Sequence, residues 1–232
     1  MSTNDDERLA SQYARRFEAE EASRTRVWSV LVASYFDRYL DGVGSVLDLG
    51  CGWGHFINQV AVPERHGIDL NPDSVRHVDP EVRLHQQPAN ERWPLEDDHL
   101  DLVFTSNFFE HLPSVDALED TLAEAHRCLR PGGRIVCLGP NIRAVGGAYW
   151  DFLDHVIPLT DRSMVEALEQ AGFEVESSIA RFLPFTMAGK RPAPSLAIRA
   201  YLHLRPAWRV LGGQFLVVAA KPQMVSGRAG SQ

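Results

Sequence analysis

The sequence predicts a doubly wound, Rossmann-like α/β fold built on a mostly parallel sheet. One observation is that short apolar segments alternate along the chain with stretches of helical periodicity. The other is that the first apolar segment, residues 46–49, runs directly into three glycines at alternate positions. A buried strand, a glycine loop and a helix in this order hold a nucleotide-like ligand at the carboxyl end of the strand. We therefore expect the functional residues at strand ends.

Composition indicates a globular protein. The 232 residues suit one domain with a small appendage, and the 44% hydrophobic and 23% charged content is ordinary. The chain contains no apolar run near the roughly 18 residues needed to span a bilayer, and its polar first residues do not resemble a signal peptide. Its three cysteines lack metal-ligand spacing, which predicts reduced thiols and a cytoplasmic location.

Charge is distributed unevenly along the chain. Residues 1–176 hold all 31 acidic side chains, whereas residues 177–232 hold eight basic ones and no acidic one. This pattern fits either a solvated face or a segment that faces an anionic group of a substrate. Because the bulk of the chain is acidic, a nucleic-acid partner is disfavoured. We also expect no membrane partner, and the oligomeric state is left open.

The first elements surround the glycine loop. Apolar spacing over residues 23–40 predicts a helix packed before the first strand, and residues 41–44 end it. The spacing over residues 55–60 predicts a helix directly after the loop. Residues 67–70 form the next predicted strand, which stops at Asn71 with Pro72 opening a further helix.

The remaining elements continue the alternation of strands and helices. Residues 114–129 give the clearest helix, with Ser114 as its cap, and residues 142–160 read as a loop. Strands are predicted at 82–85, 101–107, 134–138, 173–179 and 215–220, and another helix at 161–171. We divide the chain into an N-terminal helical lid (1–40), a core (41–182 and 212–222), a cap insertion (183–211) and a flexible tail (223–232).

The glycine loop has its own chemistry. Its spacing, Gly50-x-Gly52-x-Gly54, differs from the dinucleotide fingerprint, and no lysine follows it as in a phosphate-binding loop. Asp48 precedes the first glycine by two residues, and a carboxylate there suits a cationic ligand group better than a pyrophosphate. Asp69 lies at the end of the second predicted strand, about 20 residues after the loop, where an acidic residue can accept hydrogen bonds from ribose hydroxyls.

These motifs jointly resemble the class I S-adenosylmethionine-dependent methyltransferases, in particular the small bacterial type 11 group. The resemblance covers roughly residues 40–141. It rests on Val46–Gly54, Gly67–Leu70, Trp93-Pro94-Leu95 ahead of Asp101-Leu102-Val103, Glu110-His111-Leu112 and Arg130-Pro131-Gly132-Gly133.

The resemblance implies S-adenosyl-L-methionine as the cofactor and a seven-stranded sheet whose last strand is antiparallel. It also implies that the loop wraps the methionine part of the cofactor and that Asp69 holds the ribose. The acidic residue that commonly contacts the adenine is missing here, and Asn90 is its substitute. The predicted cofactor-binding residues are Asp48, Gly50, Gly52, Gly54, Asp69, Leu70, Asn90 and Asn107.

Candidate catalytic groups gather beyond the fifth predicted strand. If the segment around Tyr149 is helical, Asp151 lies one turn before His155 and orients it as a general base. His111 is predicted to line the same site. A metal held by Asp151, Asp154, His155 and His111 is an alternative, but no spacing demands it and we predict none.

We predict O-methylation of a small polar metabolite, anionic or sugar-like, in natural-product biosynthesis. The predicted substrate-binding residues are Arg24, Arg26, Asn141, Arg143, Tyr149, Asp154, Arg181 and Arg199. N- or C-methylation is the nearest alternative. A catalytically silent S-adenosylmethionine-binding module and a nicotinamide-dependent reductase are alternatives from other classes.

Overall fold

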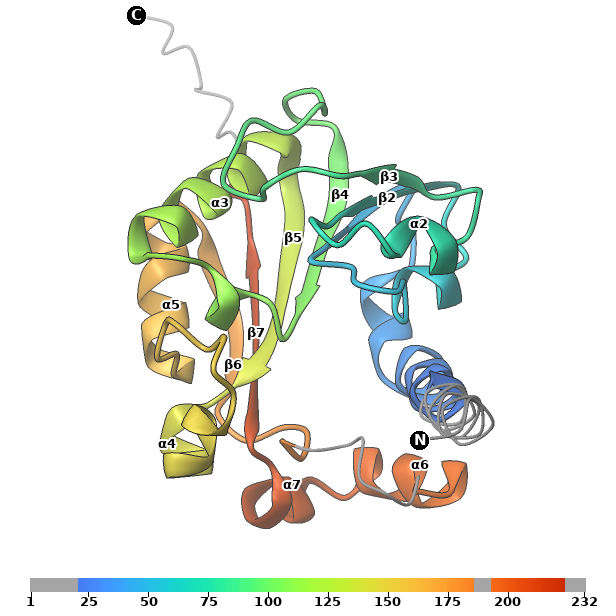
Figure 1. The fold of residues 1–232 in the computed structure, drawn as a ribbon, viewed down its shortest axis with the longest axis vertical. Coiled ribbons are helices and arrows are strands. Elements are labelled where there is room, and N and C mark those ends of the chain that lie inside the picture. Colours follow the sequence, from blue (N-terminus) through green and yellow to red (C-terminus); the bar gives the residue numbers. More distant parts are fainter. Residues whose placement is uncertain (1–20, 186–192, 224–232) are drawn as a thin grey trace, which may run out of the picture.

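A computed structural model describes residues 21–185 and 193–223, and its centre is one seven-stranded sheet (Figure 1). The strand order is β3-β2-β1-β4-β5-β7-β6; β7 is antiparallel to both of its neighbours and the other pairs are parallel. The predicted fold and its antiparallel last strand are therefore confirmed. The strands are β1 (Ser45–Leu49), β2 (Glu64–Ile68), β3 (Arg83–His85), β4 (Leu100–Ser106), β5 (Leu129–Pro140), β6 (Glu174–Ile179) and β7 (Gln214–Ala220).

Helices cover both faces of the sheet. An N-terminal helix spans residues 21–34. The other α-helices are α2 (Ser74–His77), α3 (Val115–Cys128), α4 (Ile142–Val145), α5 (Asp161–Gln170), α6 (Ser195–His203) and α7 (Arg205–Leu211). Short 3-10 helices are η1 (Phe36–Tyr39), η2 (Ile57–Gln59), η3 (Phe109–His111) and η4 (Gly146–Asp151). None of these described helices is both long enough and apolar enough to cross a membrane.

Helices α3 and α5, which cover one face of the sheet, each begin at a side-chain cap. The hydroxyl of Ser114, the predicted cap, accepts a 3.1 Å hydrogen bond from the backbone of Ala117 at the start of α3. Thr160 and Ser163 form a reciprocal capping box at the start of α5. Both helices turn an apolar stripe toward the sheet, and their buried side chains, among them Leu122 and Leu168, belong to one hydrophobic cluster.

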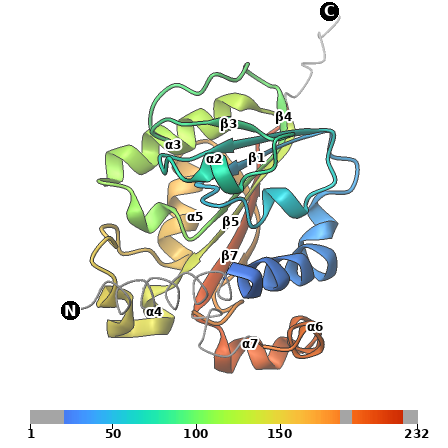
Figure 2. The same ribbon diagram turned by 45° about the vertical axis from the view of Figure 1, so that its right-hand side comes forward.

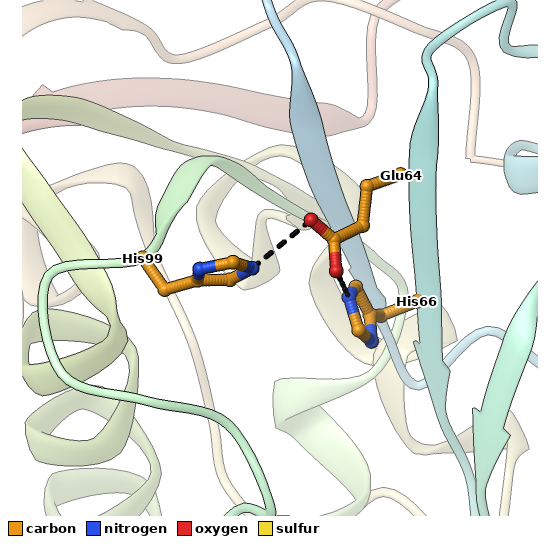
Figure 3. Close-up of side chains that lie close together, drawn as sticks. All are labelled: Glu64, His66 and His99. Atoms are coloured by element: carbon orange, nitrogen blue, oxygen red, sulfur yellow. Dashed lines mark hydrogen bonds and ion pairs between the residues drawn. The ribbon is translucent and has the colours of Figure 1, made fainter.

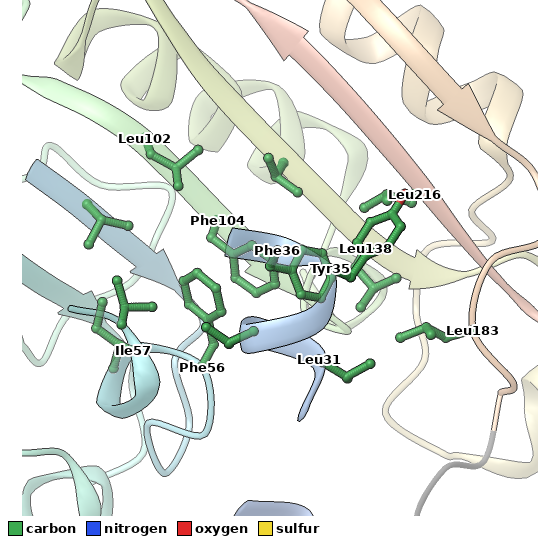
Figure 4. Close-up of a cluster of buried hydrophobic side chains, with 14 of the residues drawn as sticks. Leu31, Tyr35, Phe36, Phe56, Ile57, Leu102, Phe104, Leu138, Leu183 and Leu216 are labelled. Carbon is green, nitrogen blue, oxygen red and sulfur yellow. The ribbon is translucent and has the colours of Figure 1, made fainter. Parts of the chain in front are cut away.

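The opposite face of the sheet carries the N-terminal helix together with α6 and α7 (Figures 1 and 2). Leu31 and Phe36 are almost completely buried, and the ring of Phe36 packs edge-on against Phe104 of β4 (Figure 4). Tyr35 contacts Trp208 of α7 in the same cluster. Burial of this apolar surface fixes the N-terminal helix beside the carboxyl ends of the strands.

The connection after the glycine loop differs from the prediction. Instead of a helix over residues 55–60, only the single 3-10 turn η2 forms. Val60 turns to an extended conformation, and Pro63 follows shortly. A residue before proline is sterically biased away from the helical region, so the helix cannot extend toward β2.

Other element boundaries also differ, including β5, which begins at Leu129 and not at the predicted residue 134. Strand β2 ends at Ile68, so Asp69 and Leu70 lie just beyond it rather than within it. Helix α2 begins at Ser74 because the side chain of Asn71 first accepts a hydrogen bond from Asp73. The predicted loop 142–160 contains α4 and η4, and the predicted cap contains α6 and α7. Residues 1–20 of the predicted lid, 186–192 of the cap and 224–232 of the tail lie outside the described residues.

Candidate active site

The glycine loop is tied to the end of the neighbouring strand. The backbone amides of Gly50 and Cys51 donate to the carbonyl of Ile68 at 2.9 and 3.2 Å. The amide of Gly52 donates to Oδ2 of Asp69 at 2.6 Å, and the amide of Asn71 donates to Oδ1 of the same carboxylate at 2.8 Å. The predicted ribose-binding carboxylate therefore lies beside the predicted cofactor loop.

Two glycines of the loop are required for different reasons. Gly50 has a φ of 70° and lies so close to the ring of Phe108 that an added Cβ would overlap it. Gly52 has a φ of 52°, but an added Cβ there would meet nothing within 4 Å. The first glycine is needed for close packing, and the second borders open space in which a ligand can lie.

Asp48 is a buried carboxyl in the middle of the sheet. Only 3% of the residue is exposed, and burial raises its pKa from 3.8 to about 8, against the effect of a hydrogen bond from the backbone of Ile57. No cationic side chain is paired with it in the described parts of the chain. A positively charged ligand group at this strand end would therefore stabilise the ionised form of Asp48.

The other predicted cofactor residues lie around the same edge. Leu70 follows Asp69 with 66% of its surface exposed, an apolar area that a flat ligand ring could cover. Asn107 ends β4 in the left-handed region, with a φ of 50°. Asn90 is half-buried in a turn closed by a hydrogen bond from Glu91 to Pro88, and nothing connects it directly to the loop.

A cavity of about 390 Å³ opens at the carboxyl ends of the strands. Asn107, Leu138 of β5 and Gln214 of β7 form its floor, and the N-terminal helix closes one side. The lining is mixed, since seven of the lining residues are apolar and five are polar or charged. The lining residues are Ser23, Arg24, Val27, Trp28, Leu31, His55, Asn107, Leu138, Phe152, Leu183, Phe185 and Gln214.

His55 is a cavity residue that the sequence analysis missed. Its Nε2 lies 2.9 Å from Oε1 of Glu21 in the N-terminal helix. Burial lowers the pKa of His55, and the neighbouring Glu21 carboxylate opposes that effect. The position of a histidine directly after the third glycine was the one sequence signal for a role at the site. Its carboxylate partner, Glu21, lies in the N-terminal helix and could not be identified from local spacing.

His111 and His155, two of the predicted catalytic residues, are brought together with Glu110. The two imidazole rings are 5.0 Å apart, and Nε2 of His111 is 3.9 Å from Oε1 of Glu110. Only 1% of Glu110 is exposed, and burial raises its pKa to about 8. Oε2 of Glu110 and Nδ1 of His155 are buried without a partner among the described residues.

This cluster differs from the predicted one in its carboxylate. Asp151 ends η4 and Phe152 is extended, so Asp151 and His155 do not share a helical turn. Asp151 is exposed, and Asp154 instead lies 3.2 Å from Nδ1 of His111. The predicted orienting role of Asp151 is therefore wrong, because it assumed a helix that Phe152 interrupts. Glu110, His111 and His155 place ligand atoms within 4.8 Å of one another and could hold a divalent cation.

His155 does not line the cavity. Its ring packs nearly parallel to that of Phe152, with centroids 5.0 Å apart, and it is Phe152 that faces the cavity. Burial lowers the pKa of His155, and the neighbouring His111 lowers it further.

Two of the predicted substrate-binding residues have structural partners instead. The hydroxyl of Tyr149 donates to the carbonyl of Ile157 and accepts from the amide of Leu159, and the residue is fully buried. The side chain of Asn141 donates to Asp161 at 2.8 Å and to the carbonyl of Ala180 at 2.9 Å.

The predicted arginines divide according to the cavity. Arg24 is the only one of them in the cavity wall as described, whereas Arg26 and Arg199 are exposed elsewhere. Arg143 is half exposed and lies 3.7 Å from Asp161, and Arg181 donates to the carbonyl of Gly212 at 3.1 Å.

Comparison with known proteins gives a consistent picture. A family model described as a methyltransferase domain matches residues 8–178. A protein of Mycolicibacterium smegmatis named "probable S-adenosylmethionine-dependent methyltransferase" is 32% identical over 144 residues. This alignment covers 59% of the chain and 54% of the relative, so the matched part is about half of the relative's length.

Solved structures share the fold at low sequence identity. A SAM-dependent methyltransferase from Archaeoglobus fulgidus superposes with a TM-score of 0.65 at 23% identity, covering 88% of this chain and 99% of that one. A chain from the Haloferax volcanii complex between the Trm112 methyltransferase activator and a methyltransferase gives a TM-score of 0.62 at 18% identity. That superposition covers 89% of this chain and 95% of the other.

Proposed function

The chain belongs to the methyltransferase domain family and is an S-adenosylmethionine-dependent methyltransferase domain. On this premise we propose that it methylates an oxygen atom of a small metabolite. The acceptor occupies the cavity beneath the N-terminal helix. Because the lining combines apolar walls with polar groups, among them Arg24, the acceptor combines an apolar body with one anionic or strongly polar group. The sequence alone favours a small polar metabolite that is anionic or sugar-like. The cavity favours the anionic kind and adds an apolar body to it.

The cofactor is held at the ends of β1 and β2. S-adenosylmethionine supplies a methyl group on a positively charged sulfur, and the open side of Gly52 leaves space for it. The buried carboxyl of Asp48 suits the cationic part of this ligand, and Asp69 is placed to accept hydrogen bonds from ribose hydroxyls. We propose that Leu70 packs against the adenine.

The chain itself must hold the acceptor and take up its proton. Good alignment of reacting groups can lower the activation barrier by roughly 7–11 kcal/mol. In this proposal the cavity walls formed by the N-terminal helix and Phe152 align the acceptor with the methyl group. The N-terminal helix thus acts as the predicted lid.

His55 is the general base in this proposal. The Glu21 carboxylate, 2.9 Å from Nε2 of His55, favours the tautomer that keeps its proton on Nε2, and Nδ1 is then the nitrogen that accepts the proton of an acceptor hydroxyl. The oxygen gains the methyl group as it loses that proton. His155 stays the alternative that the sequence favours, although Phe152 and not His155 reaches the cavity wall.

Arg24 binds the anionic group of the acceptor in this proposal. It lines the same cavity as His55, so the base and the cation face one acceptor site. Arg26, two residues later on the same helix, is exposed and is not among the lining residues, so it is a matched control.

The observation that carries the proposal is that one cavity joins the loop residue His55 to Arg24 and the apolar walls. The test is a screen with methyl-labelled S-adenosylmethionine over carboxylated and phosphorylated phenols and alcohols, with amines and neutral sugars for comparison. We expect O-methylation of an anionic acceptor. Arg24→Gln should raise the acceptor KM about tenfold or more, and Arg26→Gln should leave it unchanged.

The base is tested in the same assay. His55→Gln should lower kcat by roughly 10²–10⁴-fold, whereas His155→Gln should lower it far less. The reverse order would make His155 the base. Methylation of amines alone would favour N-methylation, and cofactor binding without turnover on any acceptor would favour the silent module. The three free and buried cysteines favour a reducing compartment, so we propose a cytoplasmic, biosynthetic enzyme.

A further inference from the structure

A second group of histidines lies at the other end of the sheet. Glu64 is the first residue of β2, and His66 follows on the same face. Asp69 lies past the last residue of that strand, and the cofactor loop lies past the last residue of the neighbouring β1. His99 comes from the connection just before β4. Figure 3 shows the carboxylate of Glu64 between the two imidazole rings. This group is therefore separate from the methyl-transfer site.

The three side chains already point at one another. Oε1 of Glu64 is 3.1 Å from Nε2 of His66, and Oε2 is 3.1 Å from Nε2 of His99. One ligand atom from each residue lies within 4.8 Å of those of the other two. Two imidazole nitrogens and one carboxylate oxygen form a ligand set that zinc uses in proteins.

His66 is held in a fixed orientation. Only 2% of it is exposed, and its Nδ1 lies 3.2 Å from Nε2 of His85 at the end of β3. The rings of His66 and His85 are nearly parallel. A metal-binding histidine characteristically donates its second ring N–H to an acceptor that fixes the ring and its tautomer. Here the unprotonated Nε2 of His85 can serve as that acceptor. With Nδ1 occupied by His85, Nε2 of His66 is the nitrogen directed at Glu64.

We propose that Glu64, His66 and His99 bind a zinc ion that fastens β2 to the connection before β4. The side chains of Glu64 and His99 are 28% and 35% exposed, so an ion and a water ligand can enter from solvent. The ion replaces the two Glu64–histidine hydrogen bonds with metal–ligand bonds of about 2.0–2.2 Å. Because the site is remote from the cofactor loop, its effect is on stability.

Arg83 supports an alternative explanation for the arrangement of Glu64, His66 and His99. Its Nη1 lies 2.7 Å from Oε1 of Glu64, so Glu64, Arg83 and the histidines could form a polar network that needs no ion. Arg83 is 69% exposed and can move into solvent when an ion binds. Removing this cation should therefore tighten zinc binding if the site is real, since Glu64 is then free of a competitor.

The test is a titration of the full, untagged chain with zinc near neutral pH by calorimetry, with cobalt absorption reporting the ligand field. We expect one tight site that also raises the unfolding temperature. His99→Asn changes a partly exposed residue and should abolish this site. His85→Asn should weaken it about 10–100-fold. Arg83→Gln should bind zinc at least as tightly as the parent chain.

His155→Asn is the matched control, because Glu110, His111 and His155 form the other cluster of possible ligands among the described residues. It should retain the tight site. Absence of tight zinc binding in the parent chain would overturn the proposal. A tight site that survives His99→Asn but is lost in His155→Asn would overturn it as well, and circular dichroism of each variant checks its folding.

Discussion

Asp69 accepts a 2.6 Å hydrogen bond from the backbone amide of Gly52, so the carboxylate that ends one strand holds the loop that ends its neighbour. The two residues follow the adjacent parallel strands β1 and β2, whose carboxyl ends meet at one edge of the sheet. The same carboxylate is thus both part of the loop and a predicted contact of the ribose. Its substitution should affect cofactor binding through both roles.

We predict that Asp69→Asn weakens S-adenosylhomocysteine binding about 10–100-fold. A hydrogen bond to a charged group contributes roughly 1.5–3 kcal/mol, and each 1.4 kcal/mol corresponds to about tenfold in affinity. Asp73→Asn, at an exposed carboxylate in the same connection, is the control and should bind normally. Calorimetry measures both, and equal affinities in the two variants would contradict the assignment of Asp69.

Gly50→Ala should destabilise the chain by about 2–4 kcal/mol. Alanine pays the cost of the left-handed backbone, and its Cβ overlaps the ring of Phe108. Gly147→Ala is the matched control, since an added Cβ there meets nothing within 4 Å. Urea unfolding measures the difference, and similar midpoints for the two variants would show that the loop is not packed as described.

The raised pKa of Asp48 predicts that the stability of the chain depends on pH. Its pKa is raised to about 8 in the folded chain from an ordinary value of 3.8, so the folded chain retains a proton that the unfolded chain has released. The free energy of unfolding therefore falls as pH rises through this window, by up to about 1.4 kcal/mol per pH unit for this group. Asp48→Asn removes the titration and should lose less stability than the parent chain between pH 6 and 8. Parallel curves for parent and variant would contradict the burial effect.

Tyr149 distinguishes a structural role from substrate binding. Its hydroxyl joins Ile157 to Leu159, so Tyr149→Phe leaves a buried carbonyl and a buried amide unpaired. We expect a loss of about 1–3 kcal/mol in unfolding free energy and no specific rise in the acceptor KM. A raised KM at unchanged stability would restore the role in substrate binding that the sequence predicts.

Much of the cofactor end could be predicted from the sequence because its geometry follows from strand ends. Asp48, Gly50 and Gly52 occupy alternate positions in one strand-to-loop transition, and Asp69 follows the adjacent strand. In a parallel sheet these positions must meet, whatever the rest of the chain does. The fold class was predictable from the alternation of strands and helices, whereas the antiparallel last strand was implied only by the resemblance to the class I methyltransferases.

The acceptor end could not be predicted in the same way. The pairing of His55 with Glu21 depends on where the N-terminal helix packs, which local spacing does not encode. Asp151 and His155 have the spacing of a helical pair, but the extended conformation of Phe152 separates them. The group of Glu64, His66 and His99 likewise forms only when β2 and the connection before β4 come together.

The most direct test of the account is calorimetric titration of the full chain with S-adenosylhomocysteine and, separately, with NADH. The account predicts that S-adenosylhomocysteine binds at one site, that Asp69→Asn weakens this binding, and that NADH does not compete. Binding of NADH without binding of S-adenosylhomocysteine would contradict it.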